Sequence, residues 1–349
     1  MRRSGPRKVT FRDRCELYDA PPMRQPNRRT NGQGHPSRRN GPFGGLRRST
    51  GQGHPGGTLW AAPSRPQSAV TEHGSTTVTD PIAEDSRVID IFADVYNATL
   101  VHREDLTADL AYFRVKMDGP APVFTPGQYM TAGVVADGKM LQRPYSVASG
   151  PSSSDTTGFE LFVRHVPIVR FTTALWRLQV GHRMRMIGPK GKFMLEPDDA
   201  RTHLYVSTGT GIAPFISMIR EVMAQGKPRK TVLLNGCSFS DELGYRGELE
   251  AWEQDPAYRL TYVPTISRPA DPRNAGWTGR TGRAEQVIAE VCKAYGLKPD
   301  KTVVYICGNP EMILNAERTL MDRGFPEFHV KKELYWPKGK PGAPAPTAS

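Results

Sequence analysis

Segments typical of strands and of helices alternate along the chain between residues 201 and 334. Five short apolar segments are separated by four segments with helical periodicity, and glycines such as Gly226 mark helix ends. Neighbouring parallel strands need a crossover connection, usually a helix, so this alternation predicts a parallel sheet with helices on both faces. The expected strands are 203–207, 231–236, 260–265, 302–307 and 328–334, and the expected helices are 212–225, 247–254, 284–295 and 310–323.

The region before residue 198 has a different pattern, which begins near Val88. Short alternating segments are separated by turns that contain Gly and Pro, which is typical of a small antiparallel barrel. We expect a polar turn at 104–107 between the first two strands, and one helix at 171–178 whose Thr residues suit its N-cap. The expected strands are 96–103, 110–117, 129–135, 143–146, 158–166 and 183–187.

The first 75 residues hold most of the positive charge of the chain. They carry 14 Lys/Arg and 4 Asp/Glu, so +10 of the formal net charge of +12 lies there and the rest is nearly neutral. Large apolar residues are few in this stretch, so we expect residues 1–80 to form a disordered basic extension. An RNA-binding arm, an organelle transit segment and a translation start further along the chain remain open as alternatives. The Pro/Gly/Lys-rich segment 337–349 is expected to be a flexible tail.

The four cysteines are scattered along the chain, and no two form a Cys-x-x-Cys pair. Zinc and iron–sulfur sites need clustered cysteine ligands, so we expect no metal site and no fused ferredoxin domain. This cysteine usage indicates a reducing compartment, and we expect a cytoplasmic location. No apolar run approaches the ~18 residues of a membrane span, so we expect no membrane partner.

One strand end carries side chains that suit a flavin nucleotide. In Arg143-Pro144-Tyr145-Ser146, a guanidinium can bind a phosphate, an aromatic ring can stack on a flat heterocycle, and a hydroxyl can reach a ring nitrogen. A surface arginine beside a half-buried tyrosine would explain the same four residues. The start of the helix at 171–178 offers free N–H groups, which can form a second anion site.

A glycine turn follows the first strand of the alternating region. Gly209-Thr210-Gly211 lies between a strand and a helix, where glycines let the backbone approach a pyrophosphate. Cys307 ends a later strand on the same side of the sheet. A buried structural cysteine is the usual explanation, and a position beside a nicotinamide is the functional one.

Arginines after the later strands suggest a site for an additional phosphate. Ser267 and Arg268 end one strand, and Arg283 follows the next Gly-containing turn. Guanidinium groups that clamp a second phosphate would select NADP over NAD. Arg273 and Arg280 lie close in sequence, so the members of the clamp stay open, as does the simpler explanation of solvated loop arginines.

In this order and spacing, the motifs resemble the ferredoxin–NADP⁺ reductase superfamily across about residues 90–336. The ending Glu333-Leu334-Tyr335-Trp336 is most similar to the bacterial ferredoxin/flavodoxin–NADP⁺ reductases, although 13 residues follow it here. The resemblance implies an antiparallel FAD-binding barrel at 88–198 and a parallel α/β NADP-binding domain at 199–336. It also implies that FAD and NADP(H) are the cofactors, that a hydride moves to or from the FAD, and that ferredoxin or flavodoxin is the protein partner.

The same resemblance assigns roles to individual residues. The residues that it places at the reacting centre are Ser146, Cys307, Glu333 and Tyr335. The residues that it places against FAD are Arg143, Pro144, Tyr145, Ser146, Phe162, Val163, Phe171, Thr172, Thr173 and Trp336. The residues that it places against NADP are Gly209, Thr210, Gly211, Ser267, Arg268 and Arg283.

Two other functions are retained as alternatives. The first is a flavin reductase component of an oxygenase or another multicomponent system, which would share both domains. The second is nucleic-acid binding through residues 1–75, which we rank below the enzymatic functions and which would show a steep dependence on salt. We expect a monomer.

Overall fold

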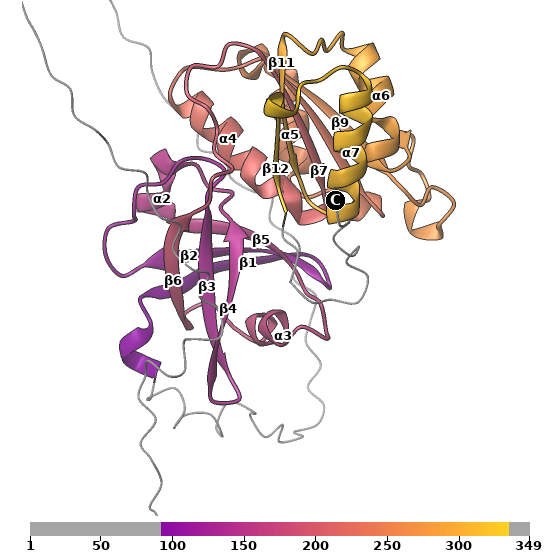
Figure 1. Cartoon of the computed structure of the whole chain (residues 1–349). Helices are drawn as coiled ribbons and strands as arrows, with labels where there is room; N and C mark the ends of the chain where they lie inside the picture. Colours follow the sequence, from indigo (N-terminus) through magenta and orange to yellow (C-terminus); the bar gives the residue numbers. More distant parts are fainter. Residues whose placement is uncertain (1–91, 335–349) are drawn as a thin grey trace, which may run out of the picture. The chain divides into compact units, whose positions relative to one another are not determined.

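The computed structural model describes residues 92–334, apart from the side chains at 155 and 156 (Figure 1). The predicted start of order at Val88, the extension at 1–80, the tail at 337–349 and the residues Tyr335 and Trp336 all lie outside the described residues. Within residues 92–334, every helix is too short or too polar to span a bilayer.

The first half of the described chain forms a six-stranded antiparallel sheet with the order β4-β3-β6-β1-β2-β5. Alternating side chains from all six strands enclose one apolar cluster, which includes Phe113, Met130 and Phe159. The predicted antiparallel, barrel-like fold of this half is therefore confirmed. The strands are β1 (Ala98–Thr107), β2 (Leu110–Met117), β3 (Tyr129–Ala136), β4 (Lys139–Ser146), β5 (Phe159–Arg164) and β6 (Arg183–Lys190).

In this half, two local predictions are wrong and one helix was missed. The expected turn at 104–107 belongs to β1, because pairing with β2 continues through two register shifts as far as Thr107. Helix α2 (Pro151–Thr157) was not expected. Helix α3 (Arg170–Trp176) has Val169 at its N-cap, with no side-chain hydrogen bond there. The Thr172 hydroxyl instead donates to Val166 O (2.9 Å) in the preceding loop.

The second half forms a parallel sheet, as the alternating pattern predicts (Figure 1). Its strand order is β10-β9-β8-β7-β11-β12, and the two-residue strand β10 was not expected from the sequence. All neighbouring pairs in this sheet are parallel. Its strands are β7 (Thr202–Thr208), β8 (Thr231–Cys237), β9 (Leu260–Ile266), β10 (Arg280–Thr281), β11 (Thr302–Cys307) and β12 (Val330–Glu333). Its helices are α4 (Ala213–Ala224), α5 (Arg246–Gln254), α6 (Ala284–Ala294) and α7 (Pro310–Asp322).

Two apolar clusters cover the two faces of the parallel sheet. Helices α4 and α5 pack on one face and α6 and α7 on the other. Alternation along the strands divides their residues between the faces: in β11, Tyr305 joins the first cluster and Ile306 the second. Short 3-10 helices complete the chain at Ala93–Val95, Gly209–Ile212 (η3), Ser240–Glu242 (η4), Pro256–Tyr258, Pro272–Asn274 (η6) and Glu327–His329.

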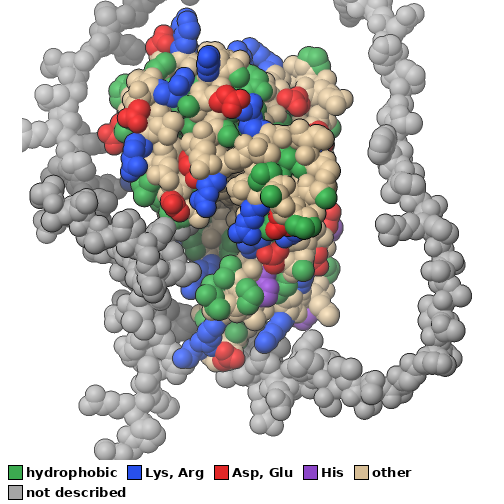
Figure 2. All heavy atoms as spheres, turned by 90° about the vertical axis from the view of Figure 1, so that its right-hand side faces the viewer, with side chains coloured by type: hydrophobic (Ala, Val, Ile, Leu, Met, Phe, Trp, Pro, Cys, Tyr) green, Lys and Arg blue, Asp and Glu red, His purple; other side chains and the backbone are tan. Residues whose placement is uncertain are grey.

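The surface of the described residues mixes charges of both signs. On the face shown in Figure 2, Lys and Arg side chains lie interspersed with Asp and Glu. This distribution agrees with a sequence whose charge outside the first 75 residues is nearly neutral.

Candidate functional site

A cavity of about 860 Å³ lies where the end of β4 meets the carboxyl ends of the parallel strands. Ligands of open α/β sheets bind at the carboxyl ends of the strands. The predicted site residues that line this cavity are Pro144, Tyr145, Ser146, Phe162, Gly209, Thr210, Gly211, Ser267, Arg268, Arg283 and Cys307. Motifs that are more than 150 positions apart in the sequence thus share one space.

Other predicted residues do not line the cavity. Arg143 is exposed and its Nη1 donates to Gln142 O (2.8 Å). Val163 and Phe171 are buried in the core of the antiparallel half. The Thr173 hydroxyl donates to Pro167 O (3.1 Å), so both threonine hydroxyls of α3 are bonded to the loop before the helix.

Ser146 and Cys307, which line the cavity, form a small buried group with Glu333, which does not line it. The Ser146 hydroxyl donates to Glu333 Oε2 (3.1 Å), and this bond joins β4 of the first half to β12 of the second. Cys307 is the register partner of Glu333 in the neighbouring strand β11. The group therefore connects the two halves of the described chain.

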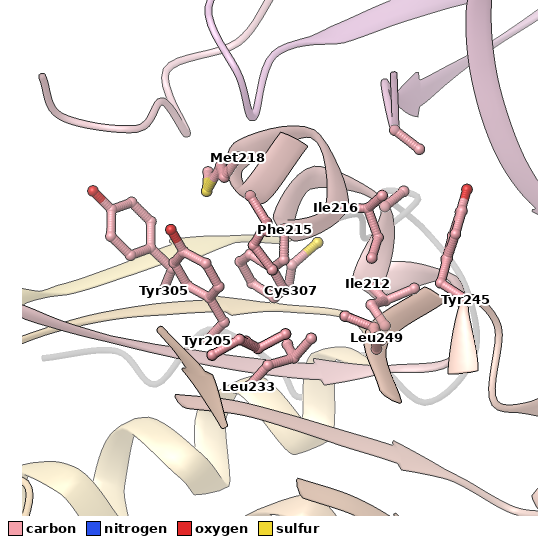
Figure 3. Packing of buried hydrophobic residues seen from close by; sticks show 14 of the residues in the cluster. Tyr205, Ile212, Phe215, Ile216, Met218, Leu233, Tyr245, Leu249, Tyr305 and Cys307 are labelled. Atoms are coloured by element: carbon pink, nitrogen blue, oxygen red, sulfur yellow. The ribbon is translucent and has the colours of Figure 1, made fainter. Parts of the chain in front are cut away.

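The thiol of Cys307 is neutral at ordinary pH. It is almost completely buried, in the apolar cluster where Figure 3 shows it beside Phe215. Burial, with a smaller contribution from the nearby Glu333 carboxylate, raises the pKa of Cys307 well above its ordinary value. A thiolate nucleophile needs the opposite shift, so the geometry suits an uncharged contact and not covalent chemistry.

The glycine turn after β7 packs directly against the turn after β11. A Cβ on Gly211 would lie 2.4 Å from Cys307 O, so only glycine fits at this position. Gly209 has φ +51 and faces open space. Glycine at both positions brings the two strand ends together and leaves backbone exposed to the cavity.

The other end of the cavity is highly charged. Arg268, Arg273 and Arg283 line it together with Glu242 and Glu285. Arg273 Nε donates to Asp241 (2.7 Å), and Arg283 Nη1 lies 3.8 Å from Glu285. The carboxylates leave this end less positive than its arginines alone would make it.

Several residues that line this end were not predicted from the sequence. Phe239 lies two residues after the end of β8, so the strand-end rule that selected Ser267 could have found it. Asp109 and Arg164 come from the antiparallel half. No local pattern marks these two, because their position depends on how the two halves meet.

Two families of domains match the sequence. Residues 97–195 match an oxidoreductase FAD-binding domain, and residues 205–318 match an oxidoreductase NAD-binding domain. The two matches fall on the antiparallel and the parallel halves, respectively.

Characterised relatives differ in their electron-transfer partners. The chain is 32% identical over 251 residues to ferredoxin–NADP reductase B of Sorangium cellulosum (strain So ce56), which covers 70% of this chain and 99% of that protein. It is 30% identical over 252 residues to reductase component 2 of the terephthalate 1,2-dioxygenase of Comamonas sp., which covers 71% of this chain and 69% of that protein.

A solved structure has the same fold. The ferredoxin NADP⁺ reductase of Neisseria gonorrhoeae, determined with bound FAD and NADP, superposes with a TM-score of 0.58 at 23% identity. The superposition covers 68% of this chain and 97% of that chain.

Proposed function

Because the chain belongs to the ferredoxin reductase superfamily and is an FAD- and NAD(P)-dependent oxidoreductase, we propose that it moves electrons between NADPH and a one-electron protein carrier, ferredoxin or flavodoxin. One observation carries the proposal: Tyr145 and Ser146 share a cavity with Cys307 and the glycine turn at 209–211. A flavin held by the first pair and a nicotinamide held by the second would meet in that space.

The residues around the cavity fit these cofactors. The half-buried ring of Tyr145 offers a surface for stacking, and the glycine turn offers backbone to a pyrophosphate. When bound, the flavin supplies the chemistry that connects a two-electron hydride donor to a one-electron carrier. The contribution of the chain is to bind, to orient and to exclude water.

Ser146, Glu333 and Cys307 are proposed to orient the reacting rings. The hydroxyl of Ser146 is oriented by the hydrogen bond that it donates to Glu333, so its oxygen would present a defined acceptor toward the flavin. The neutral thiol of Cys307 would offer an uncharged contact to the nicotinamide. Roles for Tyr335 and Trp336 remain predictions from the sequence, as do those of Arg143 and the residues of α3.

Specificity for NADPH is proposed on the basis of Ser267 and Arg268. Both line the charged end of the cavity, where a 2′-phosphate could be bound. Among residues 92–334, no carboxylate lies within ion-pair distance of the Arg268 guanidinium, so its charge is available to an anionic ligand.

A second candidate function is the reductase component of an oxygenase. The Comamonas relative is named as one, and so is the ferredoxin reductase of a carbazole 1,9a-dioxygenase, whose structure superposes with a TM-score of 0.58 at 25% identity. The chain covers 69% of each of these two proteins.

Carrier assays would separate the two functions. We expect the flavin-loaded protein to reduce ferredoxin or flavodoxin with NADPH as donor, measured by the absorbance of the carrier. Reduction of an oxygenase component alone, with ferredoxin and flavodoxin left oxidised, would favour the second candidate.

A further inference from the structure

Two arginines of the charged end stack on one aromatic ring. The Cζ atoms of Arg273 and Arg268 lie 4.2 Å and 5.3 Å from the centroid of the Phe239 ring. Phe239 follows β8, whereas both arginines belong to the loop after β9. All three residues line the cavity. A guanidinium that stacks on an aromatic ring keeps its N–H groups in the plane of the guanidinium and free to bind an anion.

A buried amide fixes the loop that carries these arginines. Asn274 is 3% exposed, and its Nδ2 donates to Arg268 O (2.8 Å) and to Ser238 O (3.1 Å). Its Oδ1 accepts a hydrogen bond from Ser240 N (2.8 Å). The loop after β9 is thus tied to the loop after β8, which carries Phe239. The backbone that carries the two arginines is therefore held in place before any ligand binds.

Its stacking on the Phe239 ring, at the lining of the cavity, distinguishes Arg273 from the other candidate arginines. Arg280 pairs with Glu290 (2.5 Å) and does not line the cavity. Arg283 stands at the start of α6, close to Glu285. Arg273 is bonded to Asp241 through Nε and lies 3.8 Å from Glu242 through Nη1. A guanidinium has five N–H groups, so Arg273 retains donors for a ligand.

Building on the proposed use of NADPH, we propose that Arg273 is the second guanidinium that binds the 2′-phosphate, together with Arg268. Phe239 is then a positioning residue that holds both guanidinium groups on one ring. Asp241 orients Arg273 through the hydrogen bond that it accepts from Nε. Neither Arg280 nor Arg283 completes the clamp under this proposal.

Binding of nucleotide fragments to the flavin-loaded full-length protein tests the proposal without turnover. Calorimetry would compare 2′,5′-ADP, which carries the 2′-phosphate, with 5′-AMP, which lacks it. We expect Arg273→Ala to weaken the binding of 2′,5′-ADP by about 10-fold or more, which is the effect of losing a charged hydrogen-bond partner. The affinity for 5′-AMP should stay unchanged. The matched control Arg280→Ala should change neither ligand. Equal affinities in Arg273→Ala and wild type would overturn the proposal, as would a 2′,5′-ADP-specific loss in Arg280→Ala.

Removing Arg273 also exposes the charge of Asp241, so a double variant is needed. If Arg273 only neutralises Asp241, then Arg273→Ala combined with Asp241→Asn should restore binding of 2′,5′-ADP. Under the proposal the double variant stays weak. Restoration would contradict direct contact with the phosphate.

Phe239→Leu tests the positioning role through steady-state kinetics. We expect the KM for NADPH to rise about 3-fold or more, with kcat and the KM for NADH unchanged, because the ring orders only the phosphate-binding groups. A fall in kcat with both nucleotides would indicate a general structural defect and overturn this role.

The use of NADPH and the role of Arg273 can be tested separately. If the wild type binds 5′-AMP as tightly as 2′,5′-ADP, the proposed use of NADPH fails and this inference fails with it. If the wild type prefers 2′,5′-ADP and Arg273→Ala keeps that preference, only the assignment of Arg273 is wrong.

Discussion

The hydroxyl of Ser146 is the smallest group on which the proposed chemistry depends. Ser146→Ala removes its bond to Glu333 and its contact with the cavity. Losing one oriented hydrogen-bonding group costs about 1.5–3 kcal/mol, so we expect flavin reduction by NADPH to slow by about 10- to 100-fold with little change in nucleotide affinity. Anaerobic stopped-flow absorbance would measure this.

Ser152→Ala provides the matched control for this prediction. Ser152 bonds to Glu221 and does not line the cavity. An unchanged rate in Ser146→Ala, or an equal loss in both variants, would count against a role for the Ser146 hydroxyl.

His203 should make the folded protein sensitive to mild acid. It is fully buried, and its Nδ1 has no hydrogen-bond partner among the described residues. Burial, together with the Arg229 guanidinium beside Nε2, lowers the pKa of His203 from 6.5 to about 4. Below pH 6.5 the unfolded state therefore binds the proton first. We expect the free energy of unfolding to fall by up to about 3 kcal/mol between pH 6.5 and 4 from this residue.

Urea unfolding at a series of pH values would test this prediction. His203→Phe keeps the ring packing against Tyr305 and removes the titration, so it should flatten the curve between pH 6.5 and 4. A slope in His203→Phe equal to that of the wild type would refute the assignment.

At the level of single residues, the sequence motifs correctly predicted many of the side chains that line the cavity. Ser146, Gly211 and Cys307 share the cavity because each ends a strand or follows one, and strand ends can be located from the sequence. The partners of Arg273 could not be predicted. Their positions depend on the loop conformation that Asn274 fixes through bonds to atoms of a different loop.

A substitution at Gly211 tests how closely two elements pack, η3 and the turn after β11. An added Cβ would meet only backbone atoms, Cys307 O at 2.4 Å and Gly308 Cα at 2.6 Å, which cannot rotate away. We expect Gly211→Ala to destabilise the protein by about 1–3 kcal/mol and to weaken NAD(P)H binding. Thermal unfolding and nucleotide titration would measure the two effects.

Gly247→Ala in α5 is the control, because its Cβ meets nothing within 4 Å. That substitution should be neutral or stabilising by up to about 1 kcal/mol. A harmless Gly211→Ala would show that the two turns are further apart than described.

The elements of the parallel half were predicted more accurately than those of the antiparallel half. Long segments with one period, such as α7, leave little choice of structure, and their expected bounds differ from the observed ones by only a residue or so. In the antiparallel half, β1 continues through polar residues that the sequence assigned to a turn. Cross-strand pairing with β2 stabilises those residues, and pairing is a tertiary property that local composition does not contain.

At the scale of the whole molecule, a buried ion network joins the two halves. The carboxylate of Glu160 in β5 accepts hydrogen bonds from Arg114 (2.8 Å), Arg220 (2.8 Å) and the Tyr245 hydroxyl (3.1 Å). Arg220 belongs to α4 of the parallel half. Although burial alone would raise it, these arginines hold the pKa of Glu160 below its ordinary value. The network keeps its charge throughout the neutral range.

Glu160→Ala should destabilise both halves of the described chain. The substitution leaves two guanidinium groups and a buried hydroxyl without their shared partner, so we expect the free energy of unfolding to fall by about 3 kcal/mol. Calorimetry should show one transition for the wild type and a lower or divided transition for the variant.

Glu250→Ala breaks only the exposed pair with Arg246 and should cost less than about 0.5 kcal/mol. If Glu160→Ala and Glu250→Ala lowered the free energy of unfolding equally, the network between the halves would not be stabilising.

The proposed function requires that one cavity brings a flavin and NADPH together, and absorbance spectroscopy of the purified protein tests this most directly. We expect one FAD bound per chain, with flavin bands that bleach when NADPH is added anaerobically and that bleach much less with NADH at equal concentration. A protein that cannot be loaded with FAD, or a bound flavin that NADPH leaves oxidised, would refute the proposed function.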